Sequence, residues 1–164
     1  MLPLLFLDLD GVVNASYDSD QAMILPRCAA QLNRILKATR ARVVISSAWR
    51  VWVHGRLMTL QGFSRMLRTH GIECQVVGVT PADGKVQGRG KQITAYLAEH
   101  PHVGRYVVLD DDEFDIRTEG HPLVRTDGGT GLTERDADLA IELLSPAPVA
   151  ADGLTQQPKP RIGV

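Results

Sequence analysis

The sequence predicts an α/β fold, with a parallel sheet of about five strands flanked by helices. Strand-like and helix-like segments alternate along the chain, which is typical of parallel strands joined by helical crossovers. A length of 164 residues suits one domain. We expect this domain over residues 1–145, followed by a flexible Pro-containing tail over 146–164.

The first predicted strand covers residues 4–9, a short and nearly continuous apolar run. A helix is predicted over 26–39, where Pro26 suits the first turn and apolar residues repeat on one face. Residues 42–46 are rich in β-branched side chains, which favours a second strand.

A second helix is predicted over residues 57–69, where an apolar stripe is followed by Gly71. Residues 73–79 are expected to form the third strand. The next helix is predicted over 90–99, directly after a glycine-rich loop.

The fourth predicted strand, residues 105–110, is again an apolar run that ends in acidic residues. Residues 123–126 are a candidate for a short fifth strand. The last helix is predicted over 133–144, because Thr133 and Asp136 have the spacing of a capping box.

Composition and charge exclude several classes of protein. The formal net charge is −1, so no overall field would draw the chain to nucleic acid or to an anionic membrane. Two cysteines in total do not indicate a disulfide framework. No apolar segment approaches the ~20 residues of a membrane span, and the N-terminus does not resemble a signal peptide. We expect a cytoplasmic protein without a membrane partner; its oligomeric state is not indicated.

Polar side chains follow several of the predicted strands, at the edge of a parallel sheet where ligands bind. Asp8 and Asp10 end the first strand, and Asp110 and Asp111 end the fourth. Carboxylates this close together repel one another, and a divalent cation would neutralise them. We expect these four residues to bind Mg²⁺, which prefers oxygen ligands and leaves room for water and phosphate.

Other residues at the same edge are suited to a phosphate group. Ser46 and Ser47 end the second strand, and Lys91 begins the helix after the third. A serine hydroxyl and a compact positive charge can both bind phosphate oxygens. Arg50 is a possible substrate contact, although an arginine stacked on tryptophan is a competing interpretation. Each residue alone has an ordinary structural explanation; their convergence at one edge favours a site.

Four motifs in order carry a resemblance to a known superfamily. DLDGV (8–12), VVISS (43–47), GRGK ending at Lys91 and VVLDDDEFD (107–115) resemble the motifs of the haloacid dehalogenase (HAD) superfamily. The strings DLDGVVN, ISSAWR, VVLDDD and LVRTD are similar to a HAD branch associated with RNA-repair-type proteins. The resemblance implies a Rossmann-like HAD hydrolase domain, with Mg²⁺ as cofactor.

The resemblance also implies roles for single residues. Asp8 would be the nucleophile and Asp10 the acid/base, while Ser46 and Lys91 would bind the phosphoryl group. Asp111 would bind Mg²⁺ together with Asp8 and the carbonyl of Asp10, with Asp110 supporting the metal site. Two points stay open. Three consecutive acids, 110–112, leave their register uncertain by one residue, and Ser47 is the alternative to Ser46.

The function expected from these motifs is Mg²⁺-dependent phosphomonoester hydrolysis through an aspartyl-phosphate. The intervals 14–25 and 50–91 are too short for a large cap domain, so an open site would suit a bulky phosphorylated substrate, such as a nucleotide or nucleic-acid end. Two interpretations are open for the basic residues Arg50, Arg56, Arg65, Arg68 and Arg89. They could form a local basic patch, or they could be solvated charges scattered over the helices. The alternatives are a receiver-like phosphoacceptor module and a catalytically silent HAD-like binding domain.

Overall fold

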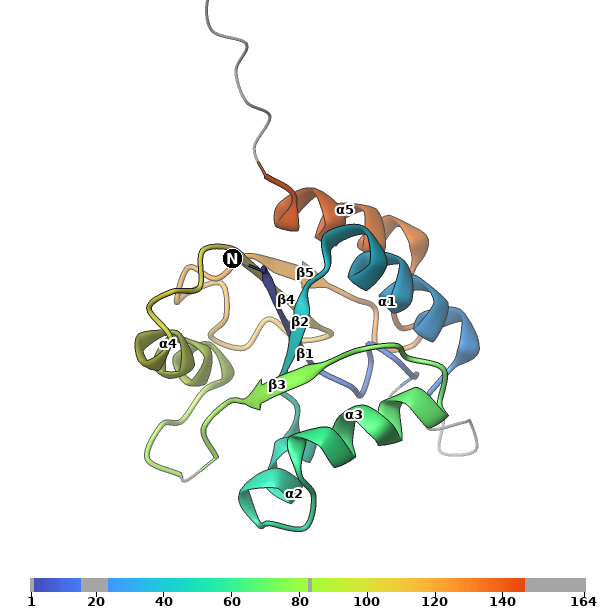
Figure 1. Cartoon of the computed structure of the whole chain (residues 1–164). Coiled ribbons are helices and arrows are strands. Elements are labelled where there is room, and N and C mark those ends of the chain that lie inside the picture. The colour runs from blue at the N-terminus through green and yellow to red at the C-terminus, as the bar shows by residue number, and fades with distance from the viewer. Residues whose placement is uncertain (1, 16–23, 83, 147–164) are drawn as a thin grey trace, which may run out of the picture.

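The computed structural model describes residues 2–15, 24–82 and 84–146. Its centre is a five-stranded, all-parallel sheet with the strand order β3-β2-β1-β4-β5 (Figure 1). This confirms the predicted α/β, Rossmann-like fold. The elements in chain order are β1 (Leu4–Leu7), α1 (Pro26–Thr39), β2 (Arg42–Ile45), η1 (Ala48–Arg50), α2 (Val51–His54), α3 (Leu60–Thr69), β3 (Val76–Val79), α4 (Arg89–Glu99), β4 (Tyr106–Asp110), β5 (Leu123–Arg125) and α5 (Glu134–Leu144).

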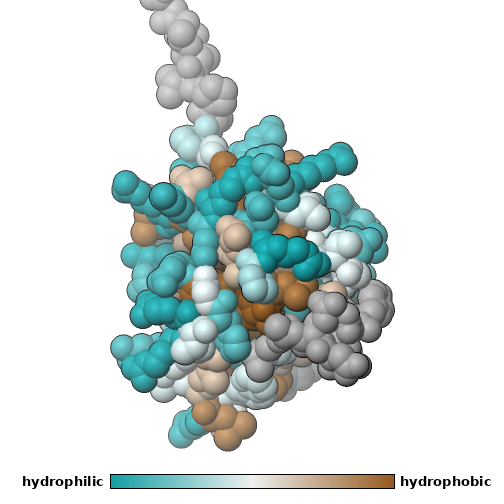
Figure 2. Space-filling model, turned by 90° about the vertical axis from the view of Figure 1, so that its right-hand side faces the viewer, coloured by the Kyte–Doolittle hydropathy of each residue, from teal (hydrophilic) through white to brown (hydrophobic). Residues whose placement is uncertain are grey.

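Each face of the sheet has its own hydrophobic core. On one face, α1, α3 and α5 pack over strand residues such as Leu5 and Val43. On the other face, α4 packs over Phe6 and Val44 with Ile93 and Tyr96. Side chains alternate across a strand, so the apolar runs predicted as strands can bury both faces. Seen from the side on which α1 lies, the surface is mostly hydrophilic, as expected for helices that turn one face inwards (Figure 2).

Several predicted elements differ at their ends from the observed ones. Helix α3 begins at Leu60 rather than at residue 57, because the Thr59 side chain accepts a hydrogen bond from the Gly62 N–H and fixes the first turn there. The 3₁₀ turn η1 and the short helix α2 were not predicted. Their sequence has no apolar repeat long enough to indicate a helix.

Two predicted features lie wholly or partly outside the described residues. The interval 14–25, which was expected to be too short for a large cap domain, includes residues 16–23, and the predicted tail includes 147–164. Between β2 and α4, the described residues hold only η1, α2, α3, β3 and their loops, with no cap domain. None of the helices in the described ranges combines the length and apolar character that crossing a membrane requires.

The ladder of backbone hydrogen bonds continues one residue beyond three strands. The N–H groups of Asp8, Ser46 and Thr80 donate to the carbonyls of the neighbouring strands, over 2.9, 3.0 and 3.0 Å respectively. These residues, together with Asp110, therefore occupy one row across the carboxyl end of the sheet. By alternation from Phe6, Val44 and Val108, the row faces α4.

Candidate active site at the carboxyl end of the sheet

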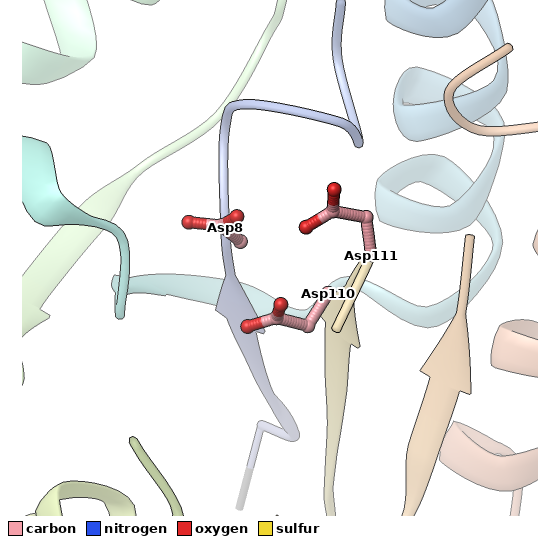
Figure 3. Close-up of side chains that lie close together, drawn as sticks. All are labelled: Asp8, Asp110 and Asp111. Atoms are coloured by element: carbon pink, nitrogen blue, oxygen red, sulfur yellow. The ribbon is translucent and has the colours of Figure 1, made fainter. Parts of the chain in front are cut away.

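Three carboxylates meet between the ends of β1 and β4. Asp8 follows β1, Asp110 is the last residue of β4, and Asp111 comes next (Figure 3). One oxygen of each lies within 4.8 Å of the others. Asp8 and Asp110 are buried, whereas Asp111 is half-buried. The structure thus brings together three of the four acids predicted as metal ligands.

The side chain of Asp10, the fourth predicted ligand, is not part of this cluster. It is exposed, and its two oxygens accept hydrogen bonds from Asn14 Nδ2 and Trp49 Nε1, each over 3.0 Å. Gly11 follows with a φ of 77°, a conformation that suits glycine and turns the chain away from the strand. Asp8 and Asp10 therefore lie in different surroundings, because Asp8 is buried and Asp10 is exposed to solvent.

Arg89, at the first position of α4, provides the positive charge beside the buried acids. Its Nη1 lies 2.9 Å from Asp8 Oδ1 and 2.5 Å from Asp110 Oδ2. Lys91, which was predicted to bind the phosphoryl group, is exposed. Its charge instead helps to lower the pKa of Asp115, which packs at the start of α4. Residues two apart on a helix point in different directions, so only one of the two basic residues can face the acids.

Arg89 lies between two glycines, Gly88 and Gly90, which pack closely against Asp115. A Cβ on Gly90 would lie 2.6 Å from the carbonyl oxygen of Asp115. The Asp115 carboxylate accepts the N–H groups of Gly90 and Lys91 over 2.7 and 3.1 Å. Burial raises the pKa of Asp115, but these two N–H groups and the charge of Lys91 outweigh it and hold the pKa below its usual value. This close packing fixes the start of α4 and hence the position of Arg89.

Burial dominates the electrostatics of the acidic cluster. Burial raises the pKa of Asp8 to about 7. The charge of Arg89 lowers this pKa, but repulsion from Asp110 and Asp111 partly cancels the effect of Arg89. The pKa of Asp110 is also raised by burial, against the influence of Arg89 and the Asp112 N–H. The pKa of Arg89 is raised, because its two acidic partners outweigh the cost of its burial. Further positive charge at this site would stabilise the ionised acids.

The two serines after β2 have different roles. Ser47 caps η1, because its Oγ accepts the Trp49 N–H over 3.0 Å. Ser46 is fully buried in the same row as Asp8, and its Oγ has no hydrogen-bond partner among the described residues. The Thr80 hydroxyl is likewise buried without one. Since buried hydroxyls are normally paired, Ser46 is the better suited of the two serines to bind a ligand oxygen.

Arg50 holds the backbone behind the site. Its guanidinium donates to the carbonyls of Ser46 and Ser47 over 3.1 and 2.8 Å, to that of Pro81 over 3.3 Å, and to Gln92 Oε1 over 3.0 Å. Burial lowers its pKa, and the nearby charge of Arg89 adds to this. These bonds fix the loop after β2, and a contact between Arg50 and a bound substrate stays a prediction.

The register of the acids 110–112 follows from their surroundings. Asp112 is exposed, its N–H donates to Asp110 Oδ1 over 3.0 Å, and its own Oδ1 accepts the Phe114 N–H. Asp112 therefore shapes the turn, and Asp110 and Asp111 are the pair beside Asp8. Asp110 also accepts a hydrogen bond from Arg89 on its other oxygen, which suits a supporting role.

The loop after β5 supports the loop that carries Asp10. The buried hydroxyl of Thr126 donates to the Gly11 carbonyl over 2.7 Å. The Leu132 N–H donates to the Val12 carbonyl over 2.8 Å. Sequence reasoning missed these contacts, because no local pattern links residues more than a hundred positions apart.

The donors at this edge fit a hard divalent cation and a phosphate group. Three close carboxylates offer the oxygen ligands that Mg²⁺ prefers. Arg89 and the unpaired Ser46 hydroxyl offer hydrogen-bond donors to a phosphate. The same set of groups could serve phosphoryl transfer or the reversible binding of an anion.

Comparison with known proteins agrees with the motifs and with this geometry. Residues 4–137 match the model of a family described as the HAD domain in Swiss Army Knife RNA repair proteins. No curated protein and no solved structure matches the chain. The match spans every strand of the sheet and all three close acids. The chain therefore belongs to the HAD superfamily of hydrolases, in the branch named for Swiss Army Knife RNA repair proteins.

Proposed function

We propose that this protein is a Mg²⁺-dependent phosphatase that hydrolyses phosphomonoesters through an aspartyl-phosphate. The observation that carries the proposal is the buried Asp8 carboxylate, which lies beside Asp110, Asp111 and Arg89 at the carboxyl end of the sheet. HAD membership supports a hydrolase. The finer chemistry rests on the arrangement of the side chains.

In the first half of the reaction, an oxygen of Asp8 attacks phosphorus and the ester P–O bond breaks. Asp10, in its acid form, gives its proton to the leaving oxygen and is left as a carboxylate. Arg89 and the Ser46 hydroxyl donate hydrogen bonds to the phosphoryl oxygens. Arg89 replaces Lys91 in this role, because Arg89 lies between the two buried acids.

In the second half, water attacks phosphorus and the bond to Asp8 breaks, which releases phosphate and restores the Asp8 carboxylate. Asp10 takes the proton from that water and returns to its acid form. Its exposure supports this role, since water reaches Asp10 more readily than Asp8. One buried and one exposed carboxylate can divide nucleophilic and proton-transfer work in this way.

Mg²⁺ is the cofactor that fits the site. The carboxylates of Asp8 and Asp111 would hold the ion, together with the carbonyl of Asp10, while Asp110 supports them. When bound, the ion would neutralise the crowded carboxylates and draw charge from the phosphate oxygens. The raised pKa of Asp8 supports this assignment, since without a cation the site is short of positive charge.

We further propose that the substrate is bulky, for example a phosphorylated nucleotide or a nucleic-acid end. The absence of a cap domain between β2 and α4 in the described chain supports an open site. The family's description refers to RNA repair, which agrees with this class of substrate. The net charge of −1 supports recognition through local contacts rather than through a general attraction to polyanions.

Two other functions fit the chain less well. HAD membership argues against a receiver-like signalling module. A catalytically silent binding domain is disfavoured by the presence of both Asp8 and Asp10, since a binding domain needs neither a nucleophile nor an acid/base.

Phosphate release from p-nitrophenyl phosphate and from a panel of phosphorylated nucleotides, sugars and oligonucleotide ends, with Mg²⁺ or with EDTA, tests the proposal. We expect turnover with Mg²⁺ only. Asp8→Asn should abolish it in a folded protein, and Asp10→Asn should slow it by about 10²- to 10⁴-fold while Mg²⁺ still binds. Asp112→Asn, which changes an exposed neighbouring acid, is the matched control.

The possible outcomes separate the three functions. Stoichiometric labelling of the protein without turnover would support a signalling module. No labelling and no turnover across the panel would support a silent binding domain. Full activity of the Asp8→Asn variant would refute the nucleophile assignment.

A further inference from the structure

The indole of Trp49 links the segment after β2 to the loop after β1. Its Nε1 donates a hydrogen bond to Asp10 Oδ2 over 3.0 Å. The other oxygen, Oδ1, accepts a hydrogen bond from Asn14 Nδ2 over the same distance. Both oxygens of the proposed acid/base are therefore held by neutral N–H donors that come from two different segments of the chain.

Both donors are themselves anchored. The backbone N–H of Trp49 donates to the Ser47 hydroxyl over 3.0 Å. The Trp49 ring packs against that of Trp52, with 4.8 Å between the ring centroids, and both rings pack on the larger core. The amide oxygen of Asn14 accepts the Gly11 N–H over 2.8 Å. The donors are thus in place independently of any bound substrate.

An exposed aspartate needs such anchoring if it is to transfer a proton reliably. Asp8 is fixed by burial and by Arg89, but the Asp10 side chain is exposed and has no ion pair among the described residues. A free side chain of this kind samples several rotamers. The two hydrogen bonds select one. A carboxylate has about four lone-pair sites, so two remain for proton transfer.

We propose that Trp49 is a positioning residue, whose indole N–H holds the Asp10 carboxyl group in the orientation from which it protonates the leaving oxygen. This inference rests on the proposed phosphatase function. In the step concerned, the bond from Asp8 to phosphorus forms as the ester P–O bond and the O–H bond of Asp10 break, the proton joins the leaving oxygen, and Asp10 becomes a carboxylate. The donor from Trp49 also stabilises the carboxylate that forms.

The test compares substrates that differ in their need for an acid. An alkyl phosphate has a poor leaving group and depends on protonation, whereas p-nitrophenolate leaves from p-nitrophenyl phosphate with little help. The Trp49→Phe variant removes the N–H but keeps an aromatic ring. We expect kcat/KM to fall about 10- to 100-fold for the alkyl phosphate and less than about threefold for p-nitrophenyl phosphate. This parameter reports the step that forms the aspartyl-phosphate.

Trp52→Phe is the matched control, because it removes an indole N–H from the neighbouring ring without touching Asp10. We expect Trp52→Phe to leave unchanged the ratio of kcat/KM for the alkyl phosphate to kcat/KM for p-nitrophenyl phosphate. Asn14→Ala should lower this ratio, as Trp49→Phe does. If Trp49→Phe does not fold, the result for Asn14→Ala tests the inference instead. Asp10→Asn sets the largest change in the ratio that loss of the acid can produce.

Two results would overturn the inference while leaving the phosphatase intact. One is an equal loss for both substrates in Trp49→Phe and Asn14→Ala, which would indicate a structural role only. The other is the same change in ratio in Trp52→Phe as in Trp49→Phe. A wild-type protein that hydrolyses neither substrate would overturn the phosphatase and the positioning role together, so the two failures are distinguishable.

Discussion

Replacing Asp8 by asparagine should stabilise the metal-free protein at alkaline pH, although it removes the proposed nucleophile. Burial raises the pKa of Asp8 from 3.8 to about 7. Between these two values the folded protein holds one more proton than the unfolded chain, so the free energy of unfolding falls as the pH rises. Each pKa unit corresponds to about 1.4 kcal/mol. Ionised Asp8 therefore costs the folded state about 4 kcal/mol above pH 7.

Urea unfolding in EDTA, followed by tryptophan fluorescence at pH 5 and pH 8, measures this effect. From pH 5 to pH 8 we expect the stability of Asp8→Asn, relative to wild type, to rise by about 2–3 kcal/mol. Mg²⁺ at pH 8 should stabilise wild type by binding the folded state and should have less effect on the variant. Asp10→Asn, which changes an exposed acid on the same loop, is the control for the substitution itself.

The reasoning would be refuted if Asp8→Asn differed from wild type by the same free energy at both pH values. That result would mean that Asp8 is not short of compensating charge in the folded protein. Arg89 would then neutralise Asp8 as well as Asp110, and the case for a cation at this site would be lost.

Three further predictions follow from the same contacts. Arg89→Met leaves two buried acids without their cation, so we expect destabilisation by about 3 kcal/mol above pH 7, measured by urea unfolding, and loss of phosphate release; unaltered activity would return the role to another basic residue. Ser46→Ala should lower kcat/KM for phosphate esters by about tenfold with little change in stability, whereas Ser47→Ala should lower stability by about 1 kcal/mol through loss of the η1 cap. If Ser47→Ala lowered kcat/KM and Ser46→Ala lowered stability, the roles assigned to the two serines would be exchanged. Gly90→Ala places a Cβ 2.6 Å from the Asp115 carbonyl oxygen, so thermal unfolding should show a loss of about 1–3 kcal/mol; an unchanged melting temperature would contradict the close packing.

The fold could be predicted from the sequence because the central strands β1 and β4 are mostly buried on both faces. A strand of this kind is a continuous apolar run, as in 4–7 and 106–109, and is recognisable without knowing its neighbours. The positions of Asp8 and Asp110 follow directly, since acids after such runs lie at one edge of the sheet. The strand order and the short helices near Trp49 depend on packing between distant segments, which no local pattern specifies.

The choice between Lys91 and Arg89 shows why the site was harder to predict than the fold. Two basic residues lie two positions apart at the start of a helix, and the sequence does not fix the helix start closely enough to decide which of them faces the acids. The deciding contact is the carboxylate of Asp115, 25 positions from Gly90, which fixes the first turn. The role of Asp10 has a similar dependence on Trp49, which is 39 positions away.

The hydrogen bond from Thr126 to Gly11 has a consequence for how far this domain can be shortened. The four HAD motifs all end by residue 115, so a version that stopped soon afterwards would keep every residue proposed to react. It would lose the hydrogen bond from Thr126 that supports the loop after β1, together with strand β5 and helix α5. Trimming the chain from its carboxyl end should therefore abolish the proposed phosphatase activity before any residue proposed to react is removed.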